Sequence, residues 1–209
     1  KVRNLGAMTF IDLRDRYGLT QAVIEGRKTM TRRMISGSPL LPADHIEEAR
    51  YFAGFIQIVA NDGETLLEVK SRYKVGEVVA VAQSYRDVCA GGFEPDATIL
   101  RLFEEQRIAG WTNKMFTKAE LMPYQIRITG IKCERLYDIS EADCLKEGVR
   151  VEFVRNDVPR YYYLDFKRQI KVWFDTPREA FASLIDKVSG RGMWERNPWV
   201  VAYEFELVK

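Results

Sequence analysis

Four cationic side chains and two threonines lie within residues 27–33 of this 209-residue chain. A cluster of cations can bind anionic groups such as phosphates, and the long arm of a lysine can reach a neighbouring threonine hydroxyl. On a regular strand, Lys28 and Thr31 would lie on opposite faces, because side chains alternate with a period of two. They converge only if Lys28 lies in a turn before the strand. The same segment also fits an ordinary solvated basic strand.

The sequence lacks most familiar catalytic signatures. His45 is the only histidine, which excludes histidine-dependent triads and multi-histidine metal sites within one chain. Neither common glycine-rich phosphate loop occurs, and no pair of cysteines has zinc-binding spacing. We therefore expect no metal ion and no cofactor, and we interpret His45 as a surface loop residue.

A short helix over residues 20–26 would deliver the basic segment. Thr20 is suited to cap its start, and Gly26 is suited to end it in the left-handed conformation. Residues 30–35 follow as a predicted strand. Lys28 would then lie just past the helix end, in the turn that convergence with Thr31 requires.

A second short helix is predicted over residues 140–146. Ser140 is a suitable N-cap, Asp143 lies in the first turn, where negative charge favours the helix dipole, and Gly148 ends the helix. Glu147 lies at the carboxyl end, where a carboxylate is unfavourable by about 0.3 to 1 kcal/mol relative to a cation. Such a glutamate is either exposed or held by a cation such as Lys28.

The rest of the chain is rich in predicted strands. Alternating or β-branched runs predict strands over residues 55–60, 65–71, 78–84, 125–135 and 199–208. A helix that begins at Pro177 has one apolar face, which consists of Phe181, Leu184, Ile185 and Val188. Residues 37–49 are expected to be irregular, and residues 161–163 to be polar and tyrosine-rich. Several strands with few short helices predict an α+β fold, a small mixed β-barrel.

The overall composition limits the classes of function. The formal net charge is only +2, so the whole molecule is not a polyelectrolyte binder and any nucleic-acid contact must be local. Three widely spaced cysteines favour a reducing compartment. No apolar run approaches the roughly 20 residues that span a bilayer. We expect a cytoplasmic protein without membrane contact.

Three ordered segments resemble the sequence blocks of ASCH-domain proteins. They are GRKTMTRR at residues 26–33, YKVGEVVAV at residues 73–81 and LYDISEADCLKEG at residues 136–148. The closing NPWVVAYEF at residues 197–205 is similar to the final strand of larger, phage- or prophage-type members. The resemblance implies one ASCH domain over residues 1–209, with a PUA-like barrel and short flanking helices. It also implies insertions at about 36–72, 86–120 and 149–176.

Some small bacterial ASCH proteins are amidohydrolases that act on N4-acetylcytidine. Their motif contains a lysine, a threonine three residues later and a glutamate just before a helix end, which match Lys28, Thr31 and Glu147. The resemblance implies threonine as the nucleophile, lysine as the base that activates it, and glutamate as the group that orients or protonates. Burial or nearby cations would have to lower the pKa of Lys28 for this role.

The cleft that the resemblance implies would be surrounded by substrate-binding side chains. These are Arg27, Arg32, Arg33, Gln83 and Tyr85. The arginines would lower the pKa of the lysine and contact phosphate, Gln83 would read a base edge with its amide, and Tyr85 would offer a face for stacking.

Three functions follow as alternatives. The first is a module that binds RNA, a modified nucleoside or a nucleotide through phosphate contacts and stacking. The second is an amidohydrolase that deacylates N4-acetylcytidine-like substrates, with ribonuclease action ranked lower. The third is a phage accessory protein with a vestigial cleft, whose insertions bind a protein partner that the sequence does not name.

Overall fold

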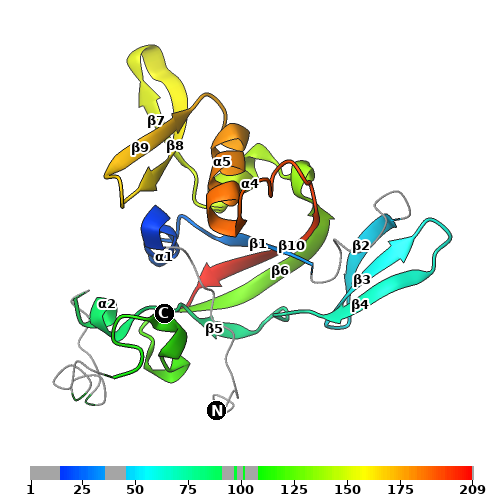
Figure 1. The fold of residues 1–209 in the computed structure, drawn as a ribbon, viewed down its shortest axis with the longest axis horizontal. Helices are drawn as coiled ribbons and strands as arrows, with labels where there is room; N and C mark the ends of the chain where they lie inside the picture. The colour runs from blue at the N-terminus through cyan, green and yellow to red at the C-terminus, as the bar shows by residue number, and fades with distance from the viewer. Residues whose placement is uncertain (1–14, 36–45, 91–96, 98–100, 102–107, 209) are drawn as a thin grey trace.

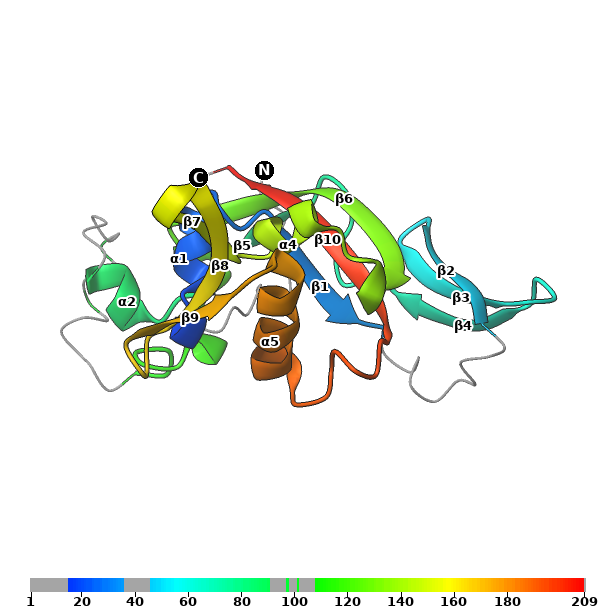
Figure 2. The same ribbon diagram turned by 90° about the horizontal axis from the view of Figure 1, so that it is seen from above.

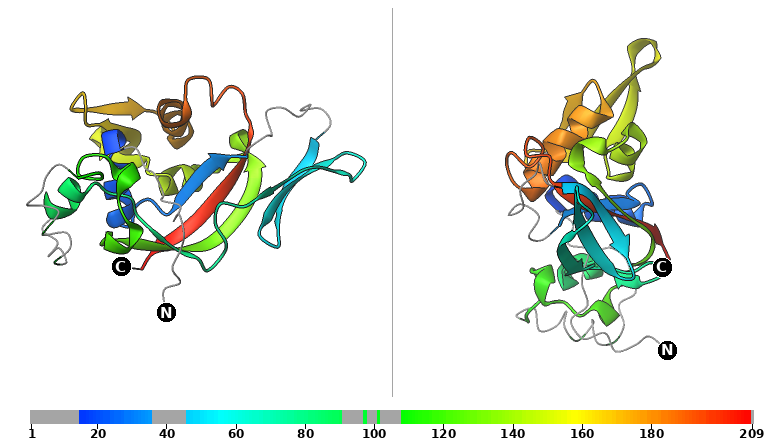
Figure 3. Two further views of the ribbon diagram at one scale, coloured as in Figure 1. Left: turned by 60° about the horizontal axis from the view of Figure 1, so that its bottom comes forward. Right: turned by 90° about the vertical axis from the view of Figure 1, so that its right-hand side faces the viewer.

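The computed structural model describes residues 15–35, 46–90, 97, 101 and 108–208. At its centre is a four-stranded antiparallel sheet in the order β1-β10-β6-β5. The strands are β1 (Met30–Met34), β10 (Trp199–Leu207), β6 (Gln125–Arg135) and β5 (Val78–Ala80). The sheet curls into a half-barrel (Figure 3). The prediction of a mixed, mostly β fold with a few short helices is confirmed at this level.

Two further sheets of three antiparallel strands extend from the centre. One contains β2 (Ile46–Phe52), β3 (Phe55–Ala60) and β4 (Thr65–Lys70), and the other β7 (Arg150–Val154), β8 (Val158–Asp165) and β9 (Ile170–Phe174). They lie at opposite ends of the molecule (Figure 1). The strands predicted over residues 55–60 and 65–71 are confirmed, and they pair as an antiparallel hairpin. The irregular prediction for residues 37–49 is wrong from Ile46 onwards, because β2 pairs along β3.

The helices are short except for one. They are α1 (Leu19–Ile24), α2 (Tyr85–Ala90), α4 (Glu141–Lys146) and α5 (Pro177–Ser189), with 3-10 turns η1 (Asp15–Tyr17), η4 (Lys114–Phe116), η5 (Ala119–Leu121), η6 (Leu136–Asp138) and η7 (Arg155–Asp157). Figures 1 and 2 place α1, α4 and α5 on the same side of the molecule, beside β1. None of the described helices is long and apolar enough to cross a membrane. His45 lies outside the described residues.

Local capping explains where the helices around β1 begin. The prediction of Thr20 as the N-cap of the first helix is wrong: Gly18, at φ 65°, holds that position, and Thr20 is buried inside α1. Ser140 caps α4 as predicted, since its side chain accepts a hydrogen bond from the Asp143 N–H. Thr176 and Glu179 form a capping box at the start of α5. These residues mark where α1, α4 and α5 begin.

The apolar face of α5 is part of the main core. Phe181, Leu184 and Ile185 are buried and belong to one cluster with residues of β1's neighbouring strands and of β8. Val188 is half-buried against the same cluster. Burying a side chain of this kind stabilises a fold by about 1.5 to 3 kcal/mol. The helix is thereby held against α4, β8 and β9.

Candidate active site

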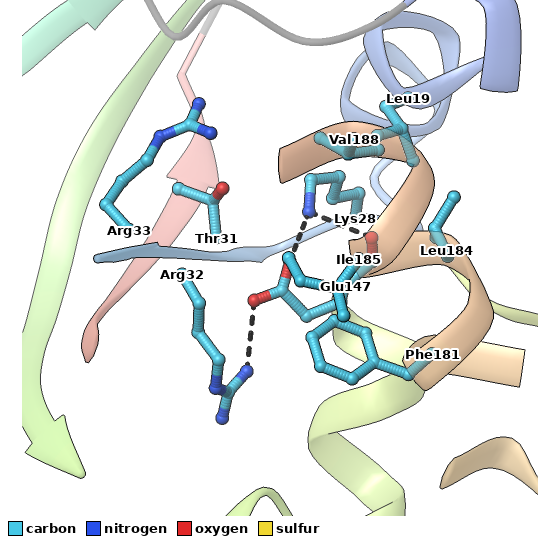
Figure 4. Close-up of a pocket in the computed structure, with 10 residues that line it drawn as sticks. All are labelled: Leu19, Lys28, Thr31, Arg32, Arg33, Glu147, Phe181, Leu184, Ile185 and Val188. Atoms are coloured by element: carbon cyan, nitrogen blue, oxygen red, sulfur yellow. Dashed lines mark hydrogen bonds and ion pairs between the residues drawn. The ribbon is translucent and has the colours of Figure 1, made fainter. Parts of the chain in front are cut away.

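Lys28 lies in a turn between α1 and β1. Gly26 has φ +71°, and the N–H groups of Arg27 and Lys28 both donate to the Ala22 carbonyl at 2.9 Å. The strand begins only at Met30. Lys28 is therefore outside the alternation of the strand, and its ammonium lies on the same side of β1 as the Thr31 hydroxyl (Figure 4). The turn that convergence requires is present.

All three N–H groups of the Lys28 ammonium are engaged. Nζ donates to the Met30 carbonyl at 2.6 Å, to the Glu147 carbonyl at 2.8 Å and to Glu147 Oε2 at 2.7 Å. The residue is only 2% exposed. Burial holds the pKa of Lys28 below its ordinary value, the Glu147 carboxylate opposes this, and the charges of Arg33 and Arg32 add to it.

Glu147 is the residue at which α4 ends. Its N–H donates to the Asp143 carbonyl, and its side chain is 5% exposed. The next residue, Gly148, has φ +107°, and a Cβ there would lie 3.0 Å from Leu19 Cδ2. A glycine is therefore needed for the end of α4 to approach α1 and Lys28. Of the two alternatives for Glu147, exposed or held by a cation, the structure has the second.

Thr31 lies beside a small pocket between β1, α4 and α5. The cavity itself has a volume of about 20 Å³, and the surrounding empty space, which includes open solvent, is about 370 Å³. Its lining consists of Leu19, Lys28, Thr31, Arg32, Arg33, Glu147, Phe181, Leu184, Ile185 and Val188. Apolar side chains of α1 and α5 form one wall, and the polar groups of β1 and Glu147 face it (Figure 4). Thr31 is 3% exposed and pairs across the sheet with Tyr203.

The arginines of the basic segment are not equivalent. Arg27 forms an ion pair with Glu25 at 2.5 Å and does not line the pocket. Arg32 is buried, with its guanidinium bound to carboxylates on the side of β1 away from Thr31. Arg33 lines the pocket beside Thr31 (Figure 4). Arg32 and Arg33 both line the pocket, but only the Arg33 guanidinium lies on the Thr31 side of β1, and those of Arg27 and Arg32 are held in ion pairs.

Gln83 and Tyr85 lie away from this pocket. Tyr85 is 3% exposed, belongs to a second apolar cluster with Val88 and Met122, and accepts a hydrogen bond from the Lys118 N–H at 3.0 Å. Its ring is therefore covered and offers no free face for stacking. The Oε1 atom of Gln83 is buried and has no hydrogen-bond partner among the described residues. Neither side chain is among the residues that line the pocket.

Sequence reasoning missed two features of the site. The apolar face of α5 was predicted only as core, yet it is also the wall of the pocket. The carboxylates of Glu134 and Asp143 surround Arg32, although residue spacing gave no signal that these segments meet. Among the described residues, no group of three histidine, cysteine or acidic side chains is placed to hold a metal ion.

Comparison with known proteins assigns no family to the chain. No family model matches the sequence, and no solved structure matches it. The aspartate–tRNA ligase of Mycoplasma capricolum is 76% identical over 25 residues, which are 12% of this chain and 4% of that protein. The match covers a small part of either chain. Functional inference therefore depends on the geometry of the pocket and on the sequence blocks that surround it.

Proposed function

We propose that this chain is a PUA-like, ASCH-type protein that binds an acylated cytosine nucleoside at the pocket beside Thr31 and hydrolyses the amide bond of that nucleoside. The observation that carries the proposal is the buried ion pair between Lys28 and Glu147, which stands beside the Thr31 hydroxyl at the pocket. These are the three residues that the ASCH resemblance aligns with the amidohydrolase motif. They come from segments more than a hundred positions apart, as the 119-residue separation of Lys28 and Glu147 shows.

The lysine must lose a proton before it can act as a base. With three hydrogen bonds donated, Lys28 is in its ammonium form. Its proton can pass to Glu147 Oε2 across the 2.7 Å contact, which converts a buried ion pair into a neutral pair. Burial favours this transfer because it disfavours charge, whereas Arg32 opposes it by stabilising the carboxylate. The pair thus supplies a neutral amine next to Thr31.

The reaction would then proceed in two acyl-transfer steps. Thr31 Oγ1 attacks the acyl carbon while Lys28 takes its proton, and the C–N bond breaks as that proton passes to the cytosine amino group. Water next attacks the threonine ester, Lys28 takes a proton from the water, and that proton returns to Thr31 as the carboxylic acid leaves. The apolar wall contributed by α5 limits access of bulk water to the ester.

Binding of RNA is less well supported by the same geometry. Two of the arginines that would contact phosphates, Arg27 and Arg32, are paired with carboxylates. The predicted stacking residue Tyr85 is buried in a separate cluster. The aromatic ring of Trp194 packs against Tyr137 and Phe181. A small pocket beside Thr31 agrees better with these contacts than a surface that follows a nucleic-acid backbone.

The test is incubation of the purified protein with N4-acetylcytidine and chromatographic measurement of cytidine. The parent protein is expected to release cytidine, while Lys28→Met and Thr31→Val are expected to lose activity by about 10² to 10⁴-fold. Thr29→Val is the matched control, since Thr29 lies in the same segment but does not line the pocket. Absence of cytidine release by the parent, or full activity in Thr31→Val, would refute the proposed function.

A further inference from the structure

Arg32 extends from β1 on the side opposite to Thr31 and Arg33 (Figure 4). Its side chain is 1% exposed. Nε donates to Glu134 Oε1 at 2.7 Å, Nη2 contacts Asp143 Oδ2 at 3.1 Å, and Nη1 contacts Glu147 Oε1 at 3.0 Å. One planar guanidinium thus joins carboxylates from β6, from inside α4 and from the end of α4. A lysine ammonium lacks the fixed fork of donors that this arrangement uses.

The two oxygens of Glu147 are divided between two cations. Oε2 accepts from Lys28 at 2.7 Å, and Oε1 accepts from Arg32 at 3.0 Å. A carboxylate held at both oxygens cannot rotate without breaking a charge-assisted hydrogen bond. The pocket side of the strand and its opposite side are therefore connected through this one carboxylate.

The carboxylates around Arg32 are themselves anchored. Lys132 pairs with Glu134 at 3.1 Å and with Asp143 at 2.8 Å. Lys146 pairs with Asp143 at 3.6 Å and with Glu204 at 3.1 Å. Burial acts to raise the pKa of Asp143, but the hydrogen bond and charge of Lys132 outweigh it, so that the pKa lies below its ordinary value. Arg32 is therefore held in a network in which the Asp143 carboxylate favours the ionised state.

We propose that Arg32 is a positioning residue, which fixes the Glu147 carboxylate so that its second oxygen faces Lys28. Arg32 thus orients the Lys28–Glu147 pair and does not bind phosphate. The catalytic part of this inference rests on the proposed function. The Arg32 guanidinium extends away from the Thr31 side of β1. Its effect on the reaction passes through Glu147.

The test that needs no substrate is hydrogen exchange of the Lys28 ammonium, followed by ¹H–¹⁵N NMR on lysine-labelled protein. The Lys28 signal is assigned by its loss in Lys28→Met. In Arg32→Gln we expect its exchange to be roughly tenfold faster or more, because Glu147 no longer holds the ammonium in place. Arg32→Lys is expected to restore part of the protection, and Arg27→Gln, an arginine outside the pocket, to leave it unchanged.

A second variant guards against general loss of stability. Arg32→Gln with Glu134→Gln removes one anion together with the cation, which preserves the charge balance of the network. If Arg32 positions Glu147, Lys28 still exchanges fast in this double variant. Slow exchange of Lys28 in folded Arg32→Gln, or in the folded double variant, would overturn the inference. Charge balance or packing alone would then hold the Lys28–Glu147 pair.

Kinetics separate this inference from the proposed function. With N4-acetylcytidine, Arg32→Gln is expected to lower kcat by roughly tenfold or more while KM changes little, because the Arg32 guanidinium lies on the side of β1 away from Thr31. Arg32→Lys is expected to recover part of kcat. A rise in KM with unchanged kcat would contradict positioning and indicate a binding role. If the parent has no activity, the proposed function fails, while the exchange measurement still decides whether Arg32 positions Glu147.

Discussion

The two faces of β1 differ in how their polar groups are satisfied. On one face, Thr31 and Arg33 line a pocket whose opposite wall is apolar. On the other face, Arg32 is surrounded by the carboxylates of Glu134, Asp143 and Glu147. The difference shows that neighbouring residues of one basic segment have separate roles, because strand alternation sends them to different surroundings. One face is available to a ligand, and the other is closed by ion pairs.

The closed face predicts the largest effect on stability. Arg32→Met leaves three carboxylates without their shared buried cation, so we expect the free energy of unfolding to fall by about 3 to 5 kcal/mol. Urea denaturation followed by circular dichroism measures this. A loss below about 1 kcal/mol would mean that water replaces the guanidinium and that the carboxylates around Arg32 are accessible to solvent.

A smaller effect is expected for Lys28, the cation that pairs with Glu147 on the pocket side. Lys28→Met removes the donor to two carbonyls and to one carboxylate oxygen, but the Arg32 contact to Glu147 remains. We expect a loss of about 1 to 3 kcal/mol in the same measurement. A loss as large as that of Arg32→Met would indicate that Lys28, and not Arg32, neutralises Glu147.

We also expect the difference in the free energy of unfolding between the parent and Lys28→Met to depend on pH. Because burial lowers the pKa of Lys28 in the folded protein, the unfolded chain binds this proton more tightly. The free energy of unfolding of the parent should therefore rise relative to Lys28→Met as the pH increases from the lowered pKa towards the ordinary value of 10.5. Unfolding of both proteins across this range provides the difference. A difference that falls with pH would mean that Glu147 raises the pKa of Lys28 by more than burial lowers it.

The open face predicts a small effect on stability and a large one on activity. Thr31→Val keeps the shape of the side chain and removes a hydroxyl that faces the pocket, so the free energy of unfolding should change by less than about 1 kcal/mol. Thermal unfolding and turnover of N4-acetylcytidine are measured on the same samples. A large loss of stability would show that the hydroxyl is a structural group.

The smallest effect is expected outside both faces. Arg27 pairs with Glu25 near the surface, where both side chains are about one-third exposed or more. Arg27→Gln should change the free energy of unfolding by only a few tenths of a kcal/mol, because exposed ion pairs are screened by water. Urea denaturation at low and high salt checks this. A change comparable to that of Lys28→Met would place Arg27 in the buried network.

The helix ends and the turn around the pocket could be predicted from the sequence, whereas the contacts between distant segments could not. Gly26, Ser140 and Gly148 are local signals, and the turn, cap and helix end that they predict are present. The position of Lys28 follows from them because its geometry is set within a few residues. Thr20 failed as a cap because Gly18, two residues earlier, already starts the helix in the left-handed conformation.

Longer-range features could not be predicted in the same way. The meeting of Arg32 with Glu134 and Asp143 depends on how β6 and α4 pack around β1, and no spacing within one segment encodes it. Tyr85 has an aromatic ring of the kind that stacks on bases, yet that ring is buried in a cluster with Val88 and Met122. Burial by distant segments decided the role of each of these side chains.

The central claim is that Thr31 carries the acyl group during the reaction. The most direct measurement is mass spectrometry of peptides from the protein, after rapid acid quenching of a reaction with N4-acetylcytidine. The account predicts an acetyl group on the peptide that contains Thr31, and its absence from Thr31→Val. Cytidine release with no acetylated Thr31, or acetylation of Lys28 in its place, would contradict the account.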